Sequence, residues 1–235
     1  MEVDYEGLKF KLFEEHLQHT QNMPLKDRFL QKVYEKPEIE GIRKYVKLKD
    51  NVLDLGGSLG VTSCVAAKHI KGNGTLVSVE ANPKLIESIK YNRDLNGLDF
   101  HIFHGAASYN NRNVKFNFNS ITQSGSIVVK NHLIGDVEKL YGKYQNIELI
   151  TTTPMDLEKK YGVKFNCLNC DIEGEEYALL FNLFDYFKSF NSILVEFHHH
   201  LNPQDYNKYY TKIIQLYSPI FNIITVGRTK FMIKK

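Results

Sequence analysis

The chain is defined first by what it lacks: it has no tryptophan, only three cysteines among 235 residues, and no long hydrophobic run. A membrane-spanning helix needs about 20 consecutive apolar residues, which no segment supplies. The formal net charge is only +3 without a basic stripe, which argues against a nucleic-acid partner. Residues 1–5 are acidic and lack the apolar core of a secretory signal. These absences predict a cytoplasmic protein.

The cysteines are too few to form a disulfide framework. Cys167 and Cys170 form a Cys-x-x-Cys pattern, which raises a redox or zinc role. Their segment has the composition of a strand, in which residues three apart point to opposite faces. No second Cys-x-x-Cys pair exists to complete a zinc site. We therefore predict that both, with Cys64, are buried, reduced core thiols.

From residue 51 onward, apolar strands alternate with amphipathic helices. The pattern predicts strands at 52–55, 75–79, 100–103, 165–170 and 192–197, and helices at 60–69, 83–95, 175–187 and 203–216. Strand–helix–strand units of this length predict an α/β fold, a right-handed, doubly wound and mainly parallel sheet of Rossmann-like type. The segments 221–226 and 231–233 suit a closing antiparallel pair.

Two parts of the chain depart from this rhythm. Residues 1–47 show apolar positions such as Leu8, Phe10, Leu12 and Phe13, which we interpret as an N-terminal helical cap too short for a core of its own. Residues from about 109 to 153 contain the strand candidates 114–119, 126–130 and 147–152. They form either a β insertion that shapes a substrate pocket or an extension of the main sheet. The whole of 1–235 is expected to be one domain with its core at 50–235.

A glycine-rich turn, Asp54-Leu55-Gly56-Gly57-Ser58-Leu59-Gly60, follows the first predicted strand, and Glu80 ends the next. Glycines allow a sharp turn and close ligand approach, and the acid suits the two hydroxyls of a ribose. The carboxyl ends of adjacent parallel strands open into one crevice. We interpret this as an adenosine site. Gly-x-Gly-x-x-Gly is absent and Asp54 would repel a pyrophosphate, so a dehydrogenase is the weaker alternative.

This turn resembles the first motif of class I S-adenosylmethionine-dependent methyltransferases. The resemblance implies that Asp54 lies near the methionine part of the cofactor and that Glu80 binds its ribose. It extends the cofactor site to the neighbours of these acids, namely Gly56, Gly57, Ser58, Gly60 and Ala81.

A second acidic cluster, Asp171-Ile172-Glu173-Gly174-Glu175-Glu176, begins where the strand at 165–170 ends. It is similar to the Asp-Val-Glu-Gly-Ala-Glu signature of the FkbM family of methyltransferases. The segments Glu80-Ala81-Asn82-Pro83, Gly105-Ala106-Ala107-Ser108 and Glu196-Phe197-His198 resemble further family motifs, so the likeness covers about residues 50–200. It implies that Ala106 and Ala107 approach the adenine and that Asp171 and Glu173 border the cofactor. It also implies O-methylation of a hydroxyl on a sugar, glycan or small molecule. Asn169 stands where the family usually has lysine.

A hydroxyl is too weakly acidic to attack a methyl group unaided, so a general base or a metal is expected. The candidates are Asp171, Glu196 and His198. Glu196 and His198 are two apart on one strand and face the same side, and an unperturbed histidine suits a base. The same three groups also suit Mg²⁺. An N-methyltransferase of proteins, and an inactive module suggested by Asn169, remain open as alternatives.

Overall fold

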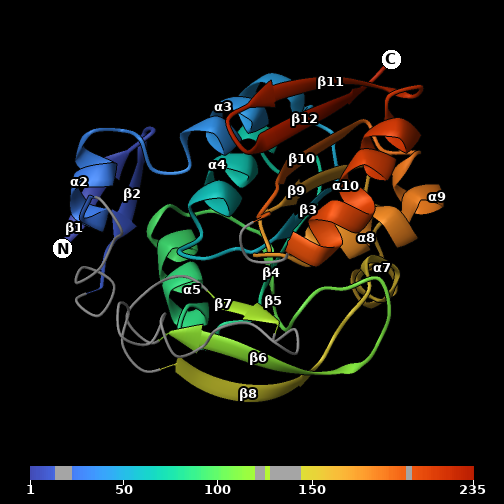
Figure 1. Ribbon diagram of the computed structural model, residues 1–235. Coiled ribbons are helices and arrows are strands. Elements are labelled where there is room, and N and C mark those ends of the chain that lie inside the picture. The colour runs from blue at the N-terminus through green and yellow to red at the C-terminus, as the bar shows by residue number, and fades with distance from the viewer. Residues whose placement is uncertain (14–22, 120–124, 128–143, 200–202) are drawn as a thin grey trace.

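The computed structural model describes residues 1–13, 23–119, 125–127, 144–199 and 203–235 (Figure 1). Its centre is a seven-stranded sheet with the order β11-β12-β10-β9-β3-β4-β5. These strands are β3 (Val52–Leu55), β4 (Leu76–Glu80), β5 (His101–His104), β9 (Cys167–Cys170), β10 (Ser192–Glu196), β11 (Phe221–Val226) and β12 (Thr229–Lys234). Strands β10, β9, β3, β4 and β5 pair in parallel, whereas β12 runs antiparallel to β10 and β11. The predicted mainly parallel sheet with an antiparallel C-terminal strand is confirmed.

The register of the parallel strands brings their carboxyl ends to one edge. Leu55 pairs with Val79 on one side and with Cys170 on the other, and Cys170 pairs with Val195. The residue that follows each of these four positions therefore lies at the same edge of the sheet. Three of those residues, Glu80, Asp171 and Glu196, are acidic candidates from the sequence.

Both faces of the sheet are buried, and side chains alternate between two cores. Val52, Cys167 and Leu194 belong to one core, and Leu53, Leu168 and Ile193 belong to the other. Continuous apolar strands are expected where helices cover both faces of a parallel sheet. The prediction for the cysteines is confirmed: all three are free and buried, and Cys167 and Cys170 lie in opposite cores.

Helices α3 (Lys36–Tyr45), α4 (Val61–Ile70) and α5 (Ile86–Leu95) pack on the first core. Helices α7 (Pro154–Tyr161), α8 (Glu176–Asn182), α9 (Phe184–Phe187) and α10 (Pro203–Tyr217) lie on the other side. Helix α7 was not predicted, although Thr153 and Asp156 form a capping box at its start. The helix expected at 175–187 is divided into α8 and α9. None of the described helices is both long and apolar enough to cross a membrane.

The helical prediction for the first residues of the chain is wrong. Strands β1 (Glu2–Tyr5) and β2 (Leu8–Lys11) form an antiparallel hairpin, and the first helix among the described residues is α2 (Leu25–Leu30). Val3, Tyr5, Leu8 and Phe10 are buried and alternate with exposed residues, which is the period of a strand and not of a helix. The hairpin turns at Glu6 and Gly7, both with positive φ.

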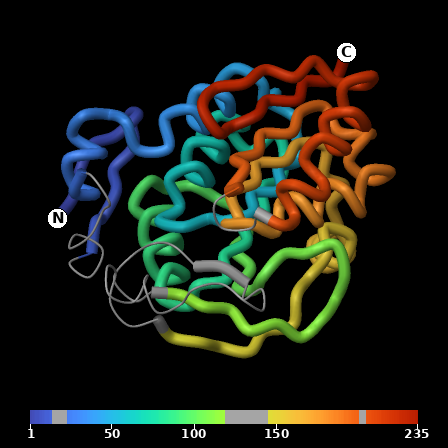
Figure 2. Tube along the Cα trace, in the orientation of Figure 1, coloured from blue at the N-terminus to red at the C-terminus, as the bar shows by residue number. Residues whose placement is uncertain are grey.

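The middle of the chain forms a sheet of its own, which supports an insertion rather than an extension of the main sheet. Strands β6 (Asn113–Asn119), β7 (Gly125–Ile127) and β8 (Tyr144–Ile150) pair antiparallel in the order β7-β6-β8. Figure 2 shows strands β6 and β8 of this layer lying to one side of the core, below the main sheet in the view. Residues 128–130 of the predicted strand lie outside the described residues.

Candidate active site

The glycine-rich loop between β3 and α4 is packed tightly against the loop that follows β9. The N–H groups of Gly56 and Gly57 both donate to the carbonyl of Val79, at 2.9 and 3.0 Å. Gly56 has φ +89°, and a Cβ atom built on it would lie 1.8 Å from the carbonyl oxygen of Asp171. Glycine is therefore required here by the close approach of the neighbouring chain as well as by the turn.

Glu80 leaves the end of β4 and folds its carboxylate over this loop. Its Oε2 accepts a hydrogen bond from the N–H of Ser58 at 2.8 Å, and its Oε1 accepts one from the N–H of Asn82 at 2.7 Å. Burial raises the pKa of Glu80 to about 7, although these backbone donors lower it. Each carboxylate oxygen retains a second lone pair for a ligand hydroxyl. Glu80 therefore stands where the sequence predicts a ribose-binding acid.

Asp54 is enclosed behind the loop. Its Oδ1 accepts a hydrogen bond from the Asn169 amide at 2.7 Å, and its Oδ2 accepts one from the Ser63 hydroxyl. Burial raises its pKa, opposed by these donors. Asp54 thus ties β3, α4 and β9 together beneath the glycine-rich loop. Asn169, at the position where the similar FkbM motif usually has lysine, donates this hydrogen bond to Asp54.

His198 lies in a cage of four carboxylates that come from the β9–α8 loop, α8 and β10. Its Nε2 is 3.4 Å from Asp171, 3.7 Å from Glu173 and 3.8 Å from Glu196, and its Nδ1 is 3.3 Å from Glu176. Burial lowers its pKa, but the Glu176 hydrogen bond and the charges of Glu173 and Asp171 outweigh burial and raise the pKa to about 10. The surrounding carboxylates therefore favour the protonated form of His198. The condition of an unperturbed pKa, on which the prediction of a histidine base depends, is not met.

The predicted catalytic trio is brought together by the fold. Ligand atoms of Asp171, Glu196 and His198 all lie within 4.8 Å of one another. Burial raises the pKa of Asp171 well above its usual value, although the charge of His198 lowers it. Arg228 donates to Glu196 at 2.5 Å. A metal at this trio would have to displace the His198 proton, because a histidine ligand binds in its neutral form.

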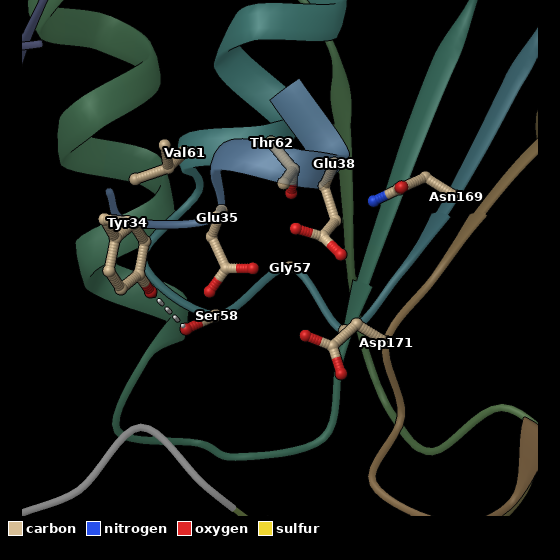
Figure 3. Close-up of a pocket in the computed structure, with 10 residues that line it drawn as sticks. Tyr34, Glu35, Glu38, Gly57, Ser58, Val61, Thr62, Asn169 and Asp171 are labelled. Carbon is tan, nitrogen blue, oxygen red and sulfur yellow. Dashed lines mark hydrogen bonds between the residues drawn. The ribbon is translucent and has the colours of Figure 1, made fainter. Parts of the chain in front are cut away.

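Three residues that the sequence analysis missed line a pocket beside the glycine-rich loop. Tyr34, Glu35 and Glu38 come from the N-terminal cap, and Figure 3 shows them on one side of the loop with Asp171 on the other. The remaining lining residues of the pocket are Gly56, Gly57, Ser58, Val61, Thr62 and Asn169. No motif or spacing in residues 1–47 signals this contact.

On the opposite side of the loop, the segment after β5 is held by a polar network. Ala106 and Ala107 are buried, and the main chain of Ala106 accepts a hydrogen bond from the N–H of Thr152 at 2.8 Å. Glu175 accepts one from the Ser108 hydroxyl at 2.5 Å and pairs with Arg112 at 2.7 Å. Glu175 therefore anchors this segment to the start of α8.

The raised carboxyl pKa values predict that stability falls as the pH rises. The pKa of Glu80 is raised to about 7 and that of Glu35 to about 8, both chiefly by burial, from an ordinary value of 4.5. A folded pKa above the unfolded one gives stability that is complete below the unfolded pKa and is lost as the pH rises through the folded one. We therefore expect Tm to fall between about pH 5 and about pH 8.5.

Scanning calorimetry across this window checks that prediction, with Glu35→Gln as the diagnostic variant. The variant should show a smaller fall in Tm than the wild type, because it removes one of the titrating groups. Asp156, whose pKa is lowered from 3.8, titrates below the window and does not interfere. A wild-type Tm that rises throughout would contradict the assignment.

The architecture matches solved methyltransferases. Over the whole of this chain, and 43% of the other, the fold aligns with a Pyrococcus abyssi tRNA (uracil-54, C5)-methyltransferase in complex with S-adenosyl-L-homocysteine, at 11% identity and a TM-score of 0.51. The fold is that of the class I methyltransferases.

Two further structures align less closely. They are a proposed O-methyltransferase from Klebsiella pneumoniae (12% identity, 85% of this chain and 80% of that one, TM-score 0.49) and the Methanococcus jannaschii fibrillarin pre-rRNA processing protein (10% identity, 81% and 67%, TM-score 0.48). No protein-family model and no curated protein sequence matches the chain. The likeness to the FkbM family therefore stays a prediction from its motifs.

Proposed function

We propose that this protein is an S-adenosylmethionine-dependent methyltransferase. The observation that carries the proposal is the Glu80 carboxylate at the carboxyl end of β4, held 2.8 Å from the N–H of Ser58 in the glycine-rich loop. An acid at this place, in the crevice shared by two adjacent parallel strands, suits the hydroxyls of an adenosine ribose. The fold and the Ala106–Ala107 segment beside it support the same assignment.

The charge around the loop favours this cofactor over a dinucleotide. Glu35, Glu38 and Asp171 line the pocket, and each has a raised pKa caused mainly by burial. A pyrophosphate would meet repulsion from these groups, whereas a sulfonium and an ammonium group would relieve their mutual repulsion. The chain therefore fits a ligand that is positively charged at the end remote from its adenine.

The order of the strands supports one orientation of the cofactor in this proposal. Its adenine would lie beside Ala106 and Ala107 after β5, its ribose at Glu80 and Ala81 after β4, and its methionine part toward Asp171 and Glu173 after β9. The loop residues Gly56, Gly57, Ser58 and Gly60 support the middle, and Asp54 holds the loop from behind.

S-adenosylmethionine would supply an electrophilic methyl group on sulfur, and this chain would have to position an acceptor and take its proton. Positioning the two reactants in line accounts for much of the acceleration. Asp171 and Glu196 are the proton acceptors we propose. The charge of His198 lowers the pKa of Asp171, against burial, which raises it.

The acceptor predicted by the motif resemblance is a hydroxyl of a sugar, glycan or small molecule. One observation favours an amine as a second candidate, namely an excess of acids around the site. The acids are Glu35, Glu38, Asp171, Glu173 and Glu196, and the cations beside them are Arg28, His198 and Arg228. This excess of acids would attract a protonated amine, whereas it would repel the phosphates of a nucleic acid. Methyl transfer from labelled cofactor to panels of sugars and of amines separates the two.

A Mg²⁺ ion remains part of the proposal only as an option at Asp171, Glu196 and His198. The donor set is chemically suitable because carboxylates bind Mg²⁺, but a histidine nitrogen is a less usual ligand for this ion. Binding and activity should therefore be measured with Mg²⁺ and with a chelator.

The buried, free thiols are consistent with the proposed cytoplasmic location.

Isothermal titration with S-adenosylhomocysteine tests the cofactor assignment. We expect micromolar binding by the wild type, and about 10- to 100-fold weaker binding by Glu80→Gln because hydrogen bonds to a charged acceptor are lost. Glu87→Gln is the matched control, since Glu87 is exposed and pairs only with Lys90 among the described residues. Absence of wild-type binding with and without Mg²⁺ would refute the proposal.

A further inference from the structure

We propose that Glu35, supplied by the N-terminal cap, binds the α-ammonium group of the methionine part of the cofactor. The inference rests on the proposed function, and it adds a recognition residue from outside the strand–loop motifs. Glu35 precedes α3 and lines the pocket together with the loop residues Gly56, Gly57 and Ser58. Figure 3 shows its carboxylate directed into the space between Tyr34, Ser58 and Gly57.

The position of this pocket relative to Glu80 identifies the part of the cofactor that it would hold. In the sheet, β4 lies on one side of β3 and β9 lies on the other. Glu80 ends β4, whereas the pocket extends toward Asn169 and Asp171 at the end of β9. A cofactor with its ribose at Glu80 and its adenine beyond β5 must therefore direct its methionine toward the pocket. The ammonium group is the part of that methionine which a carboxylate binds.

Among the carboxylates that line the pocket or border it, Glu35 is the one best placed to bind a ligand cation. Glu38 accepts a hydrogen bond from the Thr229 hydroxyl at 2.6 Å and is 4% exposed. Glu196 is held by Arg228, and Asp171 faces His198. Within the described part of the chain, no hydrogen bond is donated to the Glu35 side chain. It is half-buried and near other acids, and the charge of Arg28 offsets only part of their effect, since the pKa of Glu35 is still raised. A ligand cation would therefore stabilise its ionised form.

The backbone at Glu35 is held in an uncommon conformation. Its φ of 47° and ψ of 29° lie in the left-handed region, where a residue with a side chain is strained. The preceding residue is clamped: the Tyr34 ring stacks on Phe29 at 4.6 Å, and its carbonyl accepts a hydrogen bond from the Tyr5 hydroxyl at 2.5 Å. Arg28 lies over the same ring at 4.9 Å. The hairpin and α2 thus fix the segment that aims Glu35 at the loop.

The test compares two ligands that differ only beyond the ribose and sulfur. S-adenosylhomocysteine carries the amino acid group, and 5′-methylthioadenosine lacks it. We expect Glu35→Gln to weaken the binding of S-adenosylhomocysteine about tenfold. Its affinity for 5′-methylthioadenosine should stay within about twofold of that of the wild type. Glu40→Gln is the matched control, because Glu40 lies on α3 and its side chain is 63% exposed. It should bind both ligands as the wild type does.

Proton release gives a second readout from the same titrations. Burial and the charge of Glu38 raise the pKa of Glu35 to about 8 without ligand, so an ammonium group should expel its proton near neutral pH. Repeating the titrations in two buffers of different ionisation enthalpy measures that release. We expect wild type to release more protons with S-adenosylhomocysteine than with 5′-methylthioadenosine, and Glu35→Gln to lose this difference.

The outcomes separate this inference from the function on which it rests. If the wild type binds S-adenosylhomocysteine but Glu35→Gln weakens both ligands equally, or neither, Glu35 does not recognise the ammonium group and the inference is overturned. If the wild type binds neither ligand, the methyltransferase assignment itself fails. Thermal melts of the variants exclude misfolding as the cause of a weakened titration.

Discussion

Replacing Gly56 by alanine is expected to abolish cofactor binding and to destabilise the fold by about 2–4 kcal/mol. Two costs add up at this position. The residue has φ +89°, which a side chain disfavours, and the new Cβ would lie 1.8 Å from the Asp171 carbonyl oxygen. Because that oxygen belongs to the backbone, the β3–α4 and β9–α8 loops would have to separate, and they are the walls of the site.

Chemical unfolding and titration with S-adenosylhomocysteine measure the two effects, and the chain contains a matched control. Gly162 also has a positive φ, of 64°, but a Cβ there meets nothing within 4 Å. Gly162→Ala should therefore show only the backbone cost, about 1 kcal/mol, and normal binding. Equal losses in the two variants would show that the contact with Asp171 does not matter.

The substitution Glu176→Gln is expected to lower the free energy of unfolding by about 3–5 kcal/mol, as for other buried charge pairs that lose one partner. Glu176 is fully buried, and its two oxygens accept hydrogen bonds from the N–H groups of Gly174 and His198, both at 2.7 Å. It also faces the His198 ring. In Glu176→Gln the side-chain amide nitrogen is a donor and would face one of the two backbone N–H donors. His198 would also lose its closest carboxylate.

Urea unfolding of Glu176→Gln beside Glu87→Gln, an exposed carboxylate, checks this expectation. The pH adds a signature. The His198 pKa is raised from 6.5 to about 10, so its stabilising charge acts fully below 6.5 and is lost as the pH rises through 10. The difference in free energy of unfolding between the wild type and Glu176→Gln should therefore decrease toward alkaline pH. A loss below about 1 kcal/mol at neutral pH would contradict the role given to Glu176.

The parallel sheet and its acidic edge were predictable because they depend on local patterns. The strand 52–55 was predicted with the bounds that β3 shows, since a continuous apolar run before a glycine turn admits few other structures. Asp171, Glu196 and His198 were expected to meet because the carboxyl ends of parallel strands share one edge. Their proximity in the structure follows from that rule.

The errors arose where the local pattern was short or where the property depended on many neighbours. Leu8, Phe10 and Leu12 alternate with lysines, a strand pattern, but the adjacent Phe13 made the segment resemble a helix. The pKa of His198 depends on Glu176 in α8 and on acids from two other segments, so no inspection of the Glu196-Phe197-His198 motif could provide it. Its protonation state follows from the sum of these charges.

The sequence by itself determined the fold class, the glycine-rich loop and the strand-end acids, because hydrophobic periodicity and glycine turns act over a few residues. Only the tertiary structure decided that Tyr34, Glu35 and Glu38 face the loop around Gly57, some 20 residues later in the chain. It also decided that Asn169 donates a hydrogen bond to Asp54 and that neighbouring carboxylates raise the pKa of His198. Burial and Coulomb interactions depend on distances in space, which the order of residues along the chain does not specify.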